Sequence, residues 1–229
     1  MVRTPEAATL GTDTYQRVRS ALLEGRYAPE ERLVAADLTD EFAVHAGVVR
    51  EALTRLASEA LVVAEPNRGY RVMSAGETQV QELVELRAVA EDTAVRLAIA
   101  RGDLAWEADV LAAHHRHTGG GPGGDQKERA ARHRDFHLAV LSGCGNSRLV
   151  DLCRSLSTEA ELYRTWARLE VGRPEATHSR SGNREHRAIV DAVLARDADR
   201  ASELVVAHLR RTEKLALDYV RRGRKGTSA

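Results

Sequence analysis

The stretch HAGVVREALTRLASEALVVAEPNRGYRVMS, residues 45–74, decides how the first third of the chain folds. Its first half places apolar residues at helical spacing, and the inward set is Val48, Val49, Leu53, Leu56 and Leu61. Its second half holds two β-rich runs, LVVAE and YRVMS, joined by the turn sequence PNRG. The stretch therefore predicts a helix followed by a β-hairpin.

Two more helical patterns precede this stretch. TYQRVRSALLEG (14–25) has helical periodicity and ends at Gly25, and VAADLTDEFAV (34–44) carries Leu38 and Phe42 on one face. RYAPEERL (26–33), between them, is expected to be a turn. The order helix, helix, turn, helix, hairpin is that of a winged helix-turn-helix. We therefore predict a DNA-binding domain over residues 10–73, with a small β-hairpin as its wing.

The rest of the chain shows helical periodicity and no convincing strand. SAGE (74–77) is a small polar linker, and residues 78–222 are expected to form an all-helical domain. The helices are placed near 77–101, 103–117, 126–142, 147–169, 183–196 and 198–221. The glycine-rich stretch TGGGPGGD (118–125) separates the second of these helices from the third, and Asn146 is a suitable N-cap for the fourth helix. The prediction is a mainly α protein whose second part is an antiparallel helical bundle.

Composition limits the class of protein. The 229 residues suffice for two domains, and no apolar run is long enough to span a bilayer. The first residues lack the apolar core of a signal peptide, so a cytoplasmic protein without membrane contact is expected. Cys144 and Cys153 match no metal or redox spacing and are expected to be packed thiols. Residues 1–73 hold 9 Lys and Arg against 11 Asp and Glu, a formal charge of −2 that argues against DNA binding.

Four histidines form the main candidate site. His133 and His137 stand one helical turn apart in ARHRDFHLAVL (131–141), so both rings can point at the same spot. His186 opens the helical segment EHRAIVDAVLA, and His208 lies on an apolar face near the C-terminus. Imidazole nitrogens suit zinc, copper, iron or nickel, but a histidine on an apolar face is more often a hydrogen-bonded core residue. The remaining histidines are expected to be solvated: His114, His115, His117 and His178.

The chain resembles the GntR family of bacterial transcription regulators. In the first part the resemblance is carried by RYAPEERL, VVREALTRLASEAL and PNRGYRV. The second part resembles the FCD ligand-binding domain of the FadR subfamily through ELRAVAEDTAVRLAIAR, DFHLAVLSGCGN, EHRAIVDAVLARDADRA and AHLRR. The resemblance covers about residues 12 to 221, and it implies a DNA-binding regulator rather than an enzyme.

The resemblance implies a metal site in the second domain. His137, His186 and His208 fall on the family's three histidine positions, whereas His133 stands where the family usually has Asp. The result is either a four-histidine site or a three-histidine site with His133 turned away. Loss of the carboxylate favours zinc or nickel over a hard cation. Arg87 matches a family arginine that reaches the effector cavity, where it would bind a carboxylate; the alternative is a surface salt bridge with Glu91.

The DNA-binding end departs from the family pattern. Ala36 and Ala46 stand where the family has arginines, so binding is weakened or directed to another operator. Arg50 is retained as a base or phosphate contact, and His45 can replace part of what is lost. The further candidates are Gly47, which loosens the first turn of the recognition helix, Arg55, and Arg68 at the wing tip. Salt bridges to neighbouring acids are the alternative roles of Arg50 and Arg68.

The leading hypothesis is a homodimeric repressor of double-stranded operator DNA. A small organic acid, bound to the metal and Arg87, is expected to reduce operator binding. The two parts of the chain are expected to be joined only by the short SAGE linker, so the effect of the acid would have to pass through it. The alternative is a degenerate family member that senses a metal or metabolite without binding DNA tightly. A metalloenzyme using Glu185 or Asp135 as a base is disfavoured, because no nucleophile is paired with a base.

Overall fold

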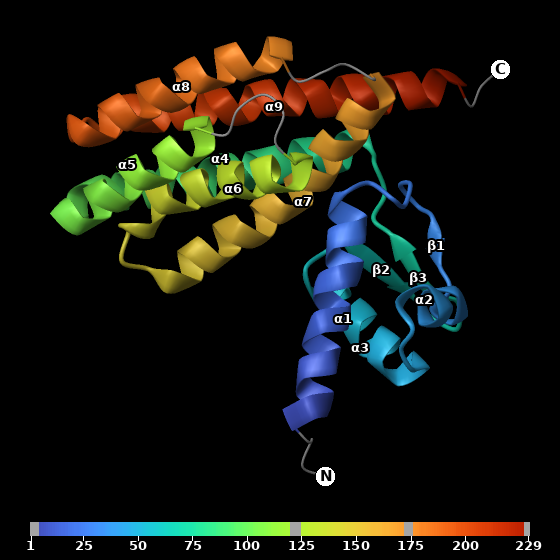
Figure 1. The fold of residues 1–229 in the computed structure, drawn as a ribbon. Helices are drawn as coiled ribbons and strands as arrows, with labels where there is room; N and C mark the ends of the chain where they lie inside the picture. Colours follow the sequence, from blue (N-terminus) through green and yellow to red (C-terminus); the bar gives the residue numbers. More distant parts are fainter. Residues whose placement is uncertain (1–4, 120–124, 172–175, 227–229) are drawn as a thin grey trace.

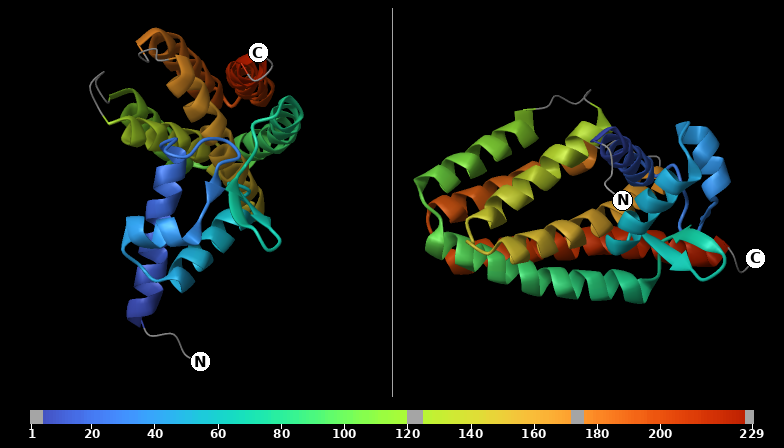
Figure 2. Two further views of the ribbon diagram at one scale, coloured as in Figure 1. Left: turned by 90° about the vertical axis from the view of Figure 1, so that its right-hand side faces the viewer. Right: turned by 90° about the horizontal axis from the view of Figure 1, so that it is seen from below.

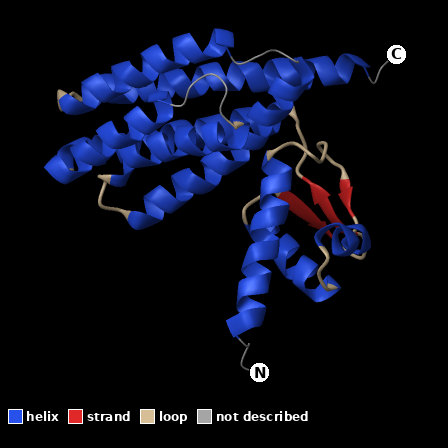
Figure 3. Ribbon diagram, viewed as in Figure 1, coloured by secondary structure: helices blue, strands red, loops and turns tan. Residues whose placement is uncertain are grey.

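The computed structural model describes residues 5–119, 125–171 and 176–226 (Figure 1). These residues form a mainly helical molecule, as the sequence predicts, in which a small three-stranded sheet lies below a bundle of long helices (Figure 3). The first part contains α1 (Pro5–Leu23), β1 (Arg32–Leu33), α2 (Ala35–Phe42), α3 (Ala46–Ser58), β2 (Val62–Glu65) and β3 (Gly69–Val72). The second part contains α4 (Glu77–Arg101), α5 (Leu104–Gly119), α6 (Gln126–Ser142), α7 (Ser147–Val171), α8 (Ala176–Leu194) and α9 (Ala198–Gly226).

The first part is a winged helix-turn-helix. α1, α2 and α3 pack around a core in which Val18, Leu22, Leu53 and Leu56 are fully buried. The chain passes from α2 to α3 through Ala43, whose left-handed backbone (φ 53°) ends α2. β2 and β3 form the predicted antiparallel hairpin, so the wing follows directly from α3.

The sheet has one strand more than the sequence analysis expected. RYAPEERL is not only a turn, because Arg32 and Leu33 pair antiparallel with Arg71 and Tyr70 of β3. The strand order is β1-β3-β2. Leu33 is buried while Arg32 is exposed, which is the alternation of a half-buried strand, but two residues are too short to show that pattern in sequence.

The second part is the predicted helical bundle, with α4, α6 and α9 among the helices that surround its interior (Figure 2). The bounds of α4 and α6 are those predicted, while α5, α7 and α9 end a few residues later and α8 starts earlier. Asn146 caps α7 as expected, because its Oδ1 accepts a hydrogen bond from the Leu149 backbone N–H at 3.2 Å. No helix among the described residues is long and apolar enough to cross a membrane.

The two parts are joined by more than the short SAGE segment, so that expectation is wrong. The C-terminal end of α1 meets α7 (Figure 1), where Thr165 Oγ1 donates a hydrogen bond to the Leu23 carbonyl at 3.1 Å. Trp166 Nε1 donates to the Tyr27 carbonyl at 3.3 Å. Gly25 lies so close to α7 that a Cβ at this position would be 2.4 Å from Leu169 Cδ1. The winged domain is therefore packed against the bundle and not merely tethered to it.

Candidate metal centre and DNA-binding face

Four histidines from three helices converge inside the bundle. α6 supplies His133 and His137, α8 supplies His186 and α9 supplies His208, and one nitrogen of each lies within 4.8 Å of the others. His137, His186 and His208 are only 3–8% exposed. His133 is not turned away, because its Nε2 lies 3.2 Å from His137 Nε2.

The unpaired nitrogens of this cluster test whether a metal would fit. His186 Nε2 and His208 Nε2 are buried and have no hydrogen-bond partner among the described residues. The Nδ1 atoms of the same two rings form hydrogen bonds on the outer side of the cluster. His186 Nδ1 lies 3.0 Å from His117 Nε2, and His208 Nδ1 lies 3.1 Å from Glu185 Oε2. Four nitrogens bound tetrahedrally at 2.0–2.1 Å from a zinc ion lie about 3.3–3.4 Å apart, so the four nitrogens, now within 4.8 Å of one another, would have to close by up to about 1.4 Å around the ion. The residues fit a transition metal ion.

The electrostatic surroundings keep these rings neutral. Burial lowers the pKa of His186 to about 2 and the pKa of His208 to about 4, from a usual value of 6.5. Burial likewise holds the pKa values of His133 and His137 well below that value, and the Arg164 guanidinium acts in the same direction on all four rings. Neutral imidazole is the form that binds metal, so the cluster is in its metal-binding state at neutral pH.

The prediction that His117 is solvated is wrong. His117 lies on α5, and its ring centroid is 4.7 Å from that of His186 and 5.4 Å from that of His133. In the sequence, His117 stands with His114 and His115 in the polar run HHRH, which is typical of an exposed segment. Nothing in the sequence showed that α5 packs against α8. Of the other three, His115 is exposed, His114 is half-buried beside Phe136, and the side chain of His178 lies outside the described residues.

Arg87 is buried and not part of a surface salt bridge. Its Nε and Nη2 atoms both donate to Glu91 Oε1, at 2.9 and 2.7 Å, and the two side chains are 4% and 2% exposed. The predicted pairing with Glu91 is therefore present, but at a buried position that also lines a cavity of about 20 Å³ between α4, α7 and α9. That volume holds about one water molecule.

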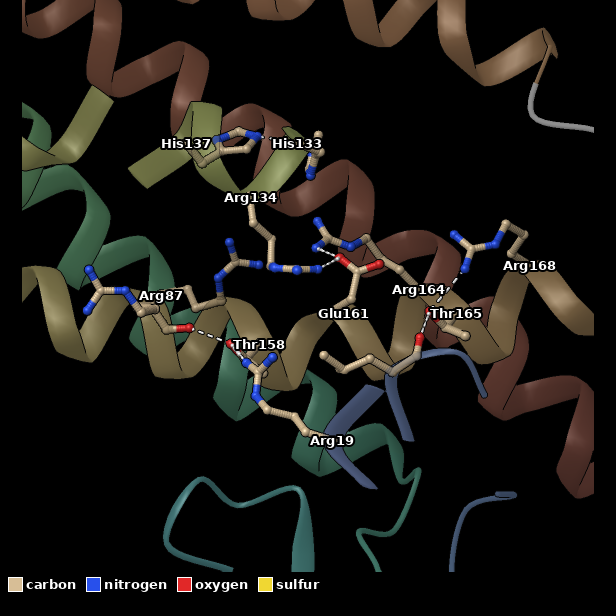
Figure 4. Close-up of polar contacts among 12 residues, drawn as sticks. Arg19, Arg87, His133, Arg134, His137, Thr158, Glu161, Arg164, Thr165 and Arg168 are labelled. Carbon is tan, nitrogen blue, oxygen red and sulfur yellow. Dashed lines mark hydrogen bonds and ion pairs between the residues drawn. The ribbon is translucent and has the colours of Figure 1, made fainter. Parts of the chain in front are cut away.

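A second arginine beside the cavity was missed by the sequence analysis. Arg164 on α7 lines the same cavity as Arg87, and its charge acts on the histidine cluster. It donates a hydrogen bond to Glu161, which also forms an ion pair with Arg134 at 3.8 Å. Figure 4 shows Arg134 and Arg164 both turned toward Glu161, close to His133 and His137. Arg164 lies in a long amphipathic helix without a recognisable motif, so no sequence signal identified it.

The predicted DNA-contact residues lie on one part of the winged domain. His45 directly precedes α3, Gly47 and Arg50 lie in its first turns, and Arg68 lies at the tip of the wing; all four are exposed. A Cβ at Gly47 would meet nothing within 4 Å. Thr54 Oγ1 lies 2.9 Å from the Tyr70 hydroxyl, which ties α3 to the wing strand. Arg55 is also exposed, and its guanidinium carbon lies 3.9 Å from the Tyr15 ring centroid.

Three glutamates of this domain form ion pairs with arginines other than Arg50 and Arg68. Glu41 pairs with Arg26, Glu59 with Arg19 and Glu65 with Arg71. Within the described residues, Arg50 and Arg68 form no ion pair, although the charge of Arg68 acts on the nearby Glu65 carboxylate. The net charge of −2 is therefore distributed unevenly, and these two exposed arginines keep their charge on the surface formed by α3 and the wing.

Comparison with known proteins agrees with this architecture. Residues 10–72 match the model of bacterial regulatory proteins of the gntR family, and residues 82–211 match that of the FCD domain. The HTH-type transcriptional repressor GlaR of Escherichia coli (strain K12) is 38% identical, over 86% of this chain and 91% of that protein. The uncharacterized HTH-type transcriptional regulator BphR of Paraburkholderia xenovorans (strain LB400) is 31% identical, over 90% of this chain and 93% of that protein.

Solved structures share the fold. A putative transcriptional regulator GntR from Rhodococcus sp. RHA1 has a TM-score of 0.71 at 26% identity and covers 91% of this chain and 97% of its own. E. coli McbR/YncC has a TM-score of 0.77 at 20% identity and covers 95% of this chain and 99% of its own. Fold and matches together define a transcription regulator with a DNA-binding winged helix-turn-helix, and not an enzyme. The chain belongs to the GntR family and carries an FCD domain, which confirms the resemblance seen in its sequence.

Proposed function

We propose that this regulator binds its operator as a homodimer under the control of a small organic acid held at a metal centre in the FCD domain. The observation that carries the proposal is the convergence of four neutral histidines beside the buried Arg87 and the partly buried Arg164. His133, His137, His186 and His208 would hold the ion, with zinc or nickel favoured because the donor set is nitrogen alone. The bound ion would supply Lewis acidity and positive charge, which attract a carboxylate.

The effector cavity supports a carboxylate ligand. Arg164 and Arg87 present guanidinium groups from opposite helices, α7 and α4, and a guanidinium pairs with a carboxylate through two parallel hydrogen bonds. The cavity of about 20 Å³ is too small for an organic acid. An effector would therefore separate the helices around it, among which α7 also contacts the winged domain.

The DNA-binding face supports operator recognition through α3 and the wing. One winged helix covers one half-site, so a homodimer on a pseudo-palindromic operator is expected. Arg50 is proposed to contact a base or phosphate and Arg68 to reach the minor groove or a phosphate, with His45, Gly47 and Arg55 on the same domain. Because GlaR, a relative at 38% identity, is named a repressor, the effector is proposed to release the operator.

The metal centre is tested by elemental analysis after purification without a chelator. About one divalent transition ion per chain is expected. His186→Ala should lose zinc or nickel affinity, whereas His115→Ala, at an exposed position on α5, should not. Wild-type protein that neither carries nor takes up either metal would remove the basis of the proposal.

The effector is tested by titrating the operator complex with hydroxy- and dicarboxylic acids. A ligand that reduces operator affinity by about 1–3 kcal/mol, the usual allosteric range, is expected. Arg164→Gln is the better probe of the two arginines, because Arg134 remains to pair with Glu161. An acid that binds in calorimetry yet leaves operator affinity unchanged would contradict the proposed control.

The second candidate function is a sensor that no longer binds DNA tightly. Ala36 and Ala46 favour it, because they lie in the first turns of α2 and α3, where the family has arginines. A gel shift on DNA from upstream of its own gene separates the two functions. Salt-dependent retention of that fragment, lost in Arg50→Ala, supports the operator-binding regulator, and no retention at low salt supports the sensor.

A further inference from the structure

A fifth histidine touches the four-histidine cluster from outside. His117 is near the C-terminal end of α5, a helix that contributes none of the four clustered nitrogens. Its Nε2 lies 3.0 Å from His186 Nδ1, and its ring stacks on Phe136 with an interplanar angle of 15°. His117 is therefore fixed in place by packing, with one nitrogen directed at the outer side of His186.

We propose that His117 is a positioning residue of the metal centre, which accepts a hydrogen bond from His186 and so holds His186 Nε2 toward the ion. The proposal rests on the metal centre proposed above and deepens it. A histidine that binds a metal through Nε2 as neutral imidazole keeps its proton on Nδ1, and this N–H needs an acceptor to fix the ring. His117 Nε2 is the atom at hydrogen-bond distance from it.

The hydrogen bond has two directions, and the metal selects one. Without an ion, either His117 or His186 can carry the shared proton. With an ion on His186 Nε2, the proton must be on His186 Nδ1, so His117 Nε2 accepts and its own proton moves to Nδ1. His117 Nδ1 is buried without a partner among the described residues, so no competing hydrogen bond there sets the tautomer.

The two outer hydrogen bonds of the site differ in chemistry. Glu185 holds His208 with a carboxylate oxygen, while His117 holds His186 with an imidazole nitrogen. An imidazole acceptor orients its ligand without adding negative charge beside the ion. Through His117 the ion also acts on α5, so four helices, α5, α6, α8 and α9, respond to metal binding.

The first test measures zinc affinity by competition with a chromophoric chelator. His117→Phe keeps a ring that packs on Phe136 but removes the acceptor, and it should weaken zinc binding by about 10–100-fold. His117→Gln places an amide oxygen at a similar reach and should retain affinity close to that of the wild type. His115→Phe, at an exposed position on the same helix, is the matched control and should bind as the wild type does.

The second test needs no variant. Nitrogen-15 NMR of the histidine rings in the zinc-loaded wild type should show His117 protonated at Nδ1 and unprotonated at Nε2. The proposal is overturned if His117→Phe binds zinc normally, if His117→Gln is as weak as His117→Phe, or if His117 carries its proton on Nε2 in the zinc-loaded protein. Wild-type protein that binds no zinc would overturn the metal centre itself, a failure seen before any His117 variant is made.

Discussion

At the scale of single residues, burial decides which histidines matter. The spacing of His133 and His137 predicted a shared direction, and helix periodicity requires it. The position of His117 could not be predicted in this way, because it depends on the packing of α5 against α8, which no local pattern encodes. Arg164 was missed for the same reason, since its approach to the cluster depends on where α7 crosses the bundle.

Neutral buried histidines make the stability of the metal-free protein depend on pH. The unfolded chain binds protons at these residues near pH 6.5, whereas burial lowers the folded-state pKa of His208 to about 4 and that of His186 to about 2. The unfolding free energy should therefore change little above pH 7 and fall from pH 7 to 5, by up to about 1.4 kcal/mol per pH unit for each such histidine.

Urea denaturation of chelator-treated protein at several pH values measures this slope. His186→Gln removes one of the groups and should give a shallower slope than the wild type. His115→Gln, at an exposed position, should leave the slope as it is. Identical slopes for the wild type and His186→Gln would contradict the argument.

The Arg87–Glu91 pair gives a second prediction at this scale. Arg87→Ala leaves the Glu91 carboxylate buried without its partner and should lower the unfolding free energy by about 3–5 kcal/mol. Arg87→Met combined with Glu91→Gln removes both charges and should be clearly less destabilised. Thermal denaturation of the two variants checks this, and equal losses would show that the cost lies in packing rather than in an unpaired charge.

At the scale of elements, the sequence predicted the long helices well and the short strand not at all. α4 and α6 have the predicted bounds, because clear breaks stand at each end: Gly76 and Gly102 flank α4, and Asp125 and Gly143 flank α6. β1 was missed because two residues carry no periodicity and are held by pairing with β3, a contact with residues about forty positions away. Local signals thus fix helices, while tertiary pairing fixes this strand.

The N-cap of α7 is an element whose contribution can be measured. Asn146 follows Gly145, whose positive φ of 66° turns the chain into the helix, and it caps the Leu149 N–H. Asn146→Ala should lower the unfolding free energy by about 1 kcal/mol, and Asn146→Ser should recover most of it. Chemical denaturation of both variants checks this, and a serine variant as unstable as the alanine variant would mean that the side-chain cap is not the cause.

At the scale of the whole molecule, the packing of α7 against the winged domain was not predictable from sequence. The short linker suggested two loosely joined parts. The contacts between them could not be seen in the sequence, because interdomain hydrogen bonds produce no periodic pattern of residues. In the structure, Arg19 of α1 donates to Glu59 Oε2 beside α3 and to Thr158 Oγ1 of α7, both at 3.1 Å. Thr158 is one turn before Glu161, the partner of Arg164 at the cavity. Figure 4 shows Arg19 turned toward Thr158 on the opposite side of α7 from the histidines.

This arrangement predicts that Thr158 transmits the effector signal. An acid that enters the proposed effector cavity would displace α7, and the displacement would reach α3 through Thr158, Arg19 and Glu59. Thr158→Val keeps the side-chain shape and removes the hydroxyl that accepts from Arg19. It should leave metal and acid binding unchanged and reduce the effect of the acid on operator affinity by about 0.5–2 kcal/mol. Calorimetry with the acid and fluorescence anisotropy with operator DNA measure the two quantities separately.

The matched control is Thr93→Val. Thr93 bonds back to the Val89 carbonyl at 2.9 Å, just as Thr158 bonds to the Arg154 carbonyl, but it is exposed on α4 and makes no contact with the winged domain in the described residues. Its coupling should equal that of the wild type. If Thr158→Val also keeps full coupling, the contact with α7 is passive and the signal passes through SAGE. If Thr158→Val loses acid binding as well, α7 shapes the cavity and the two roles of this helix are inseparable.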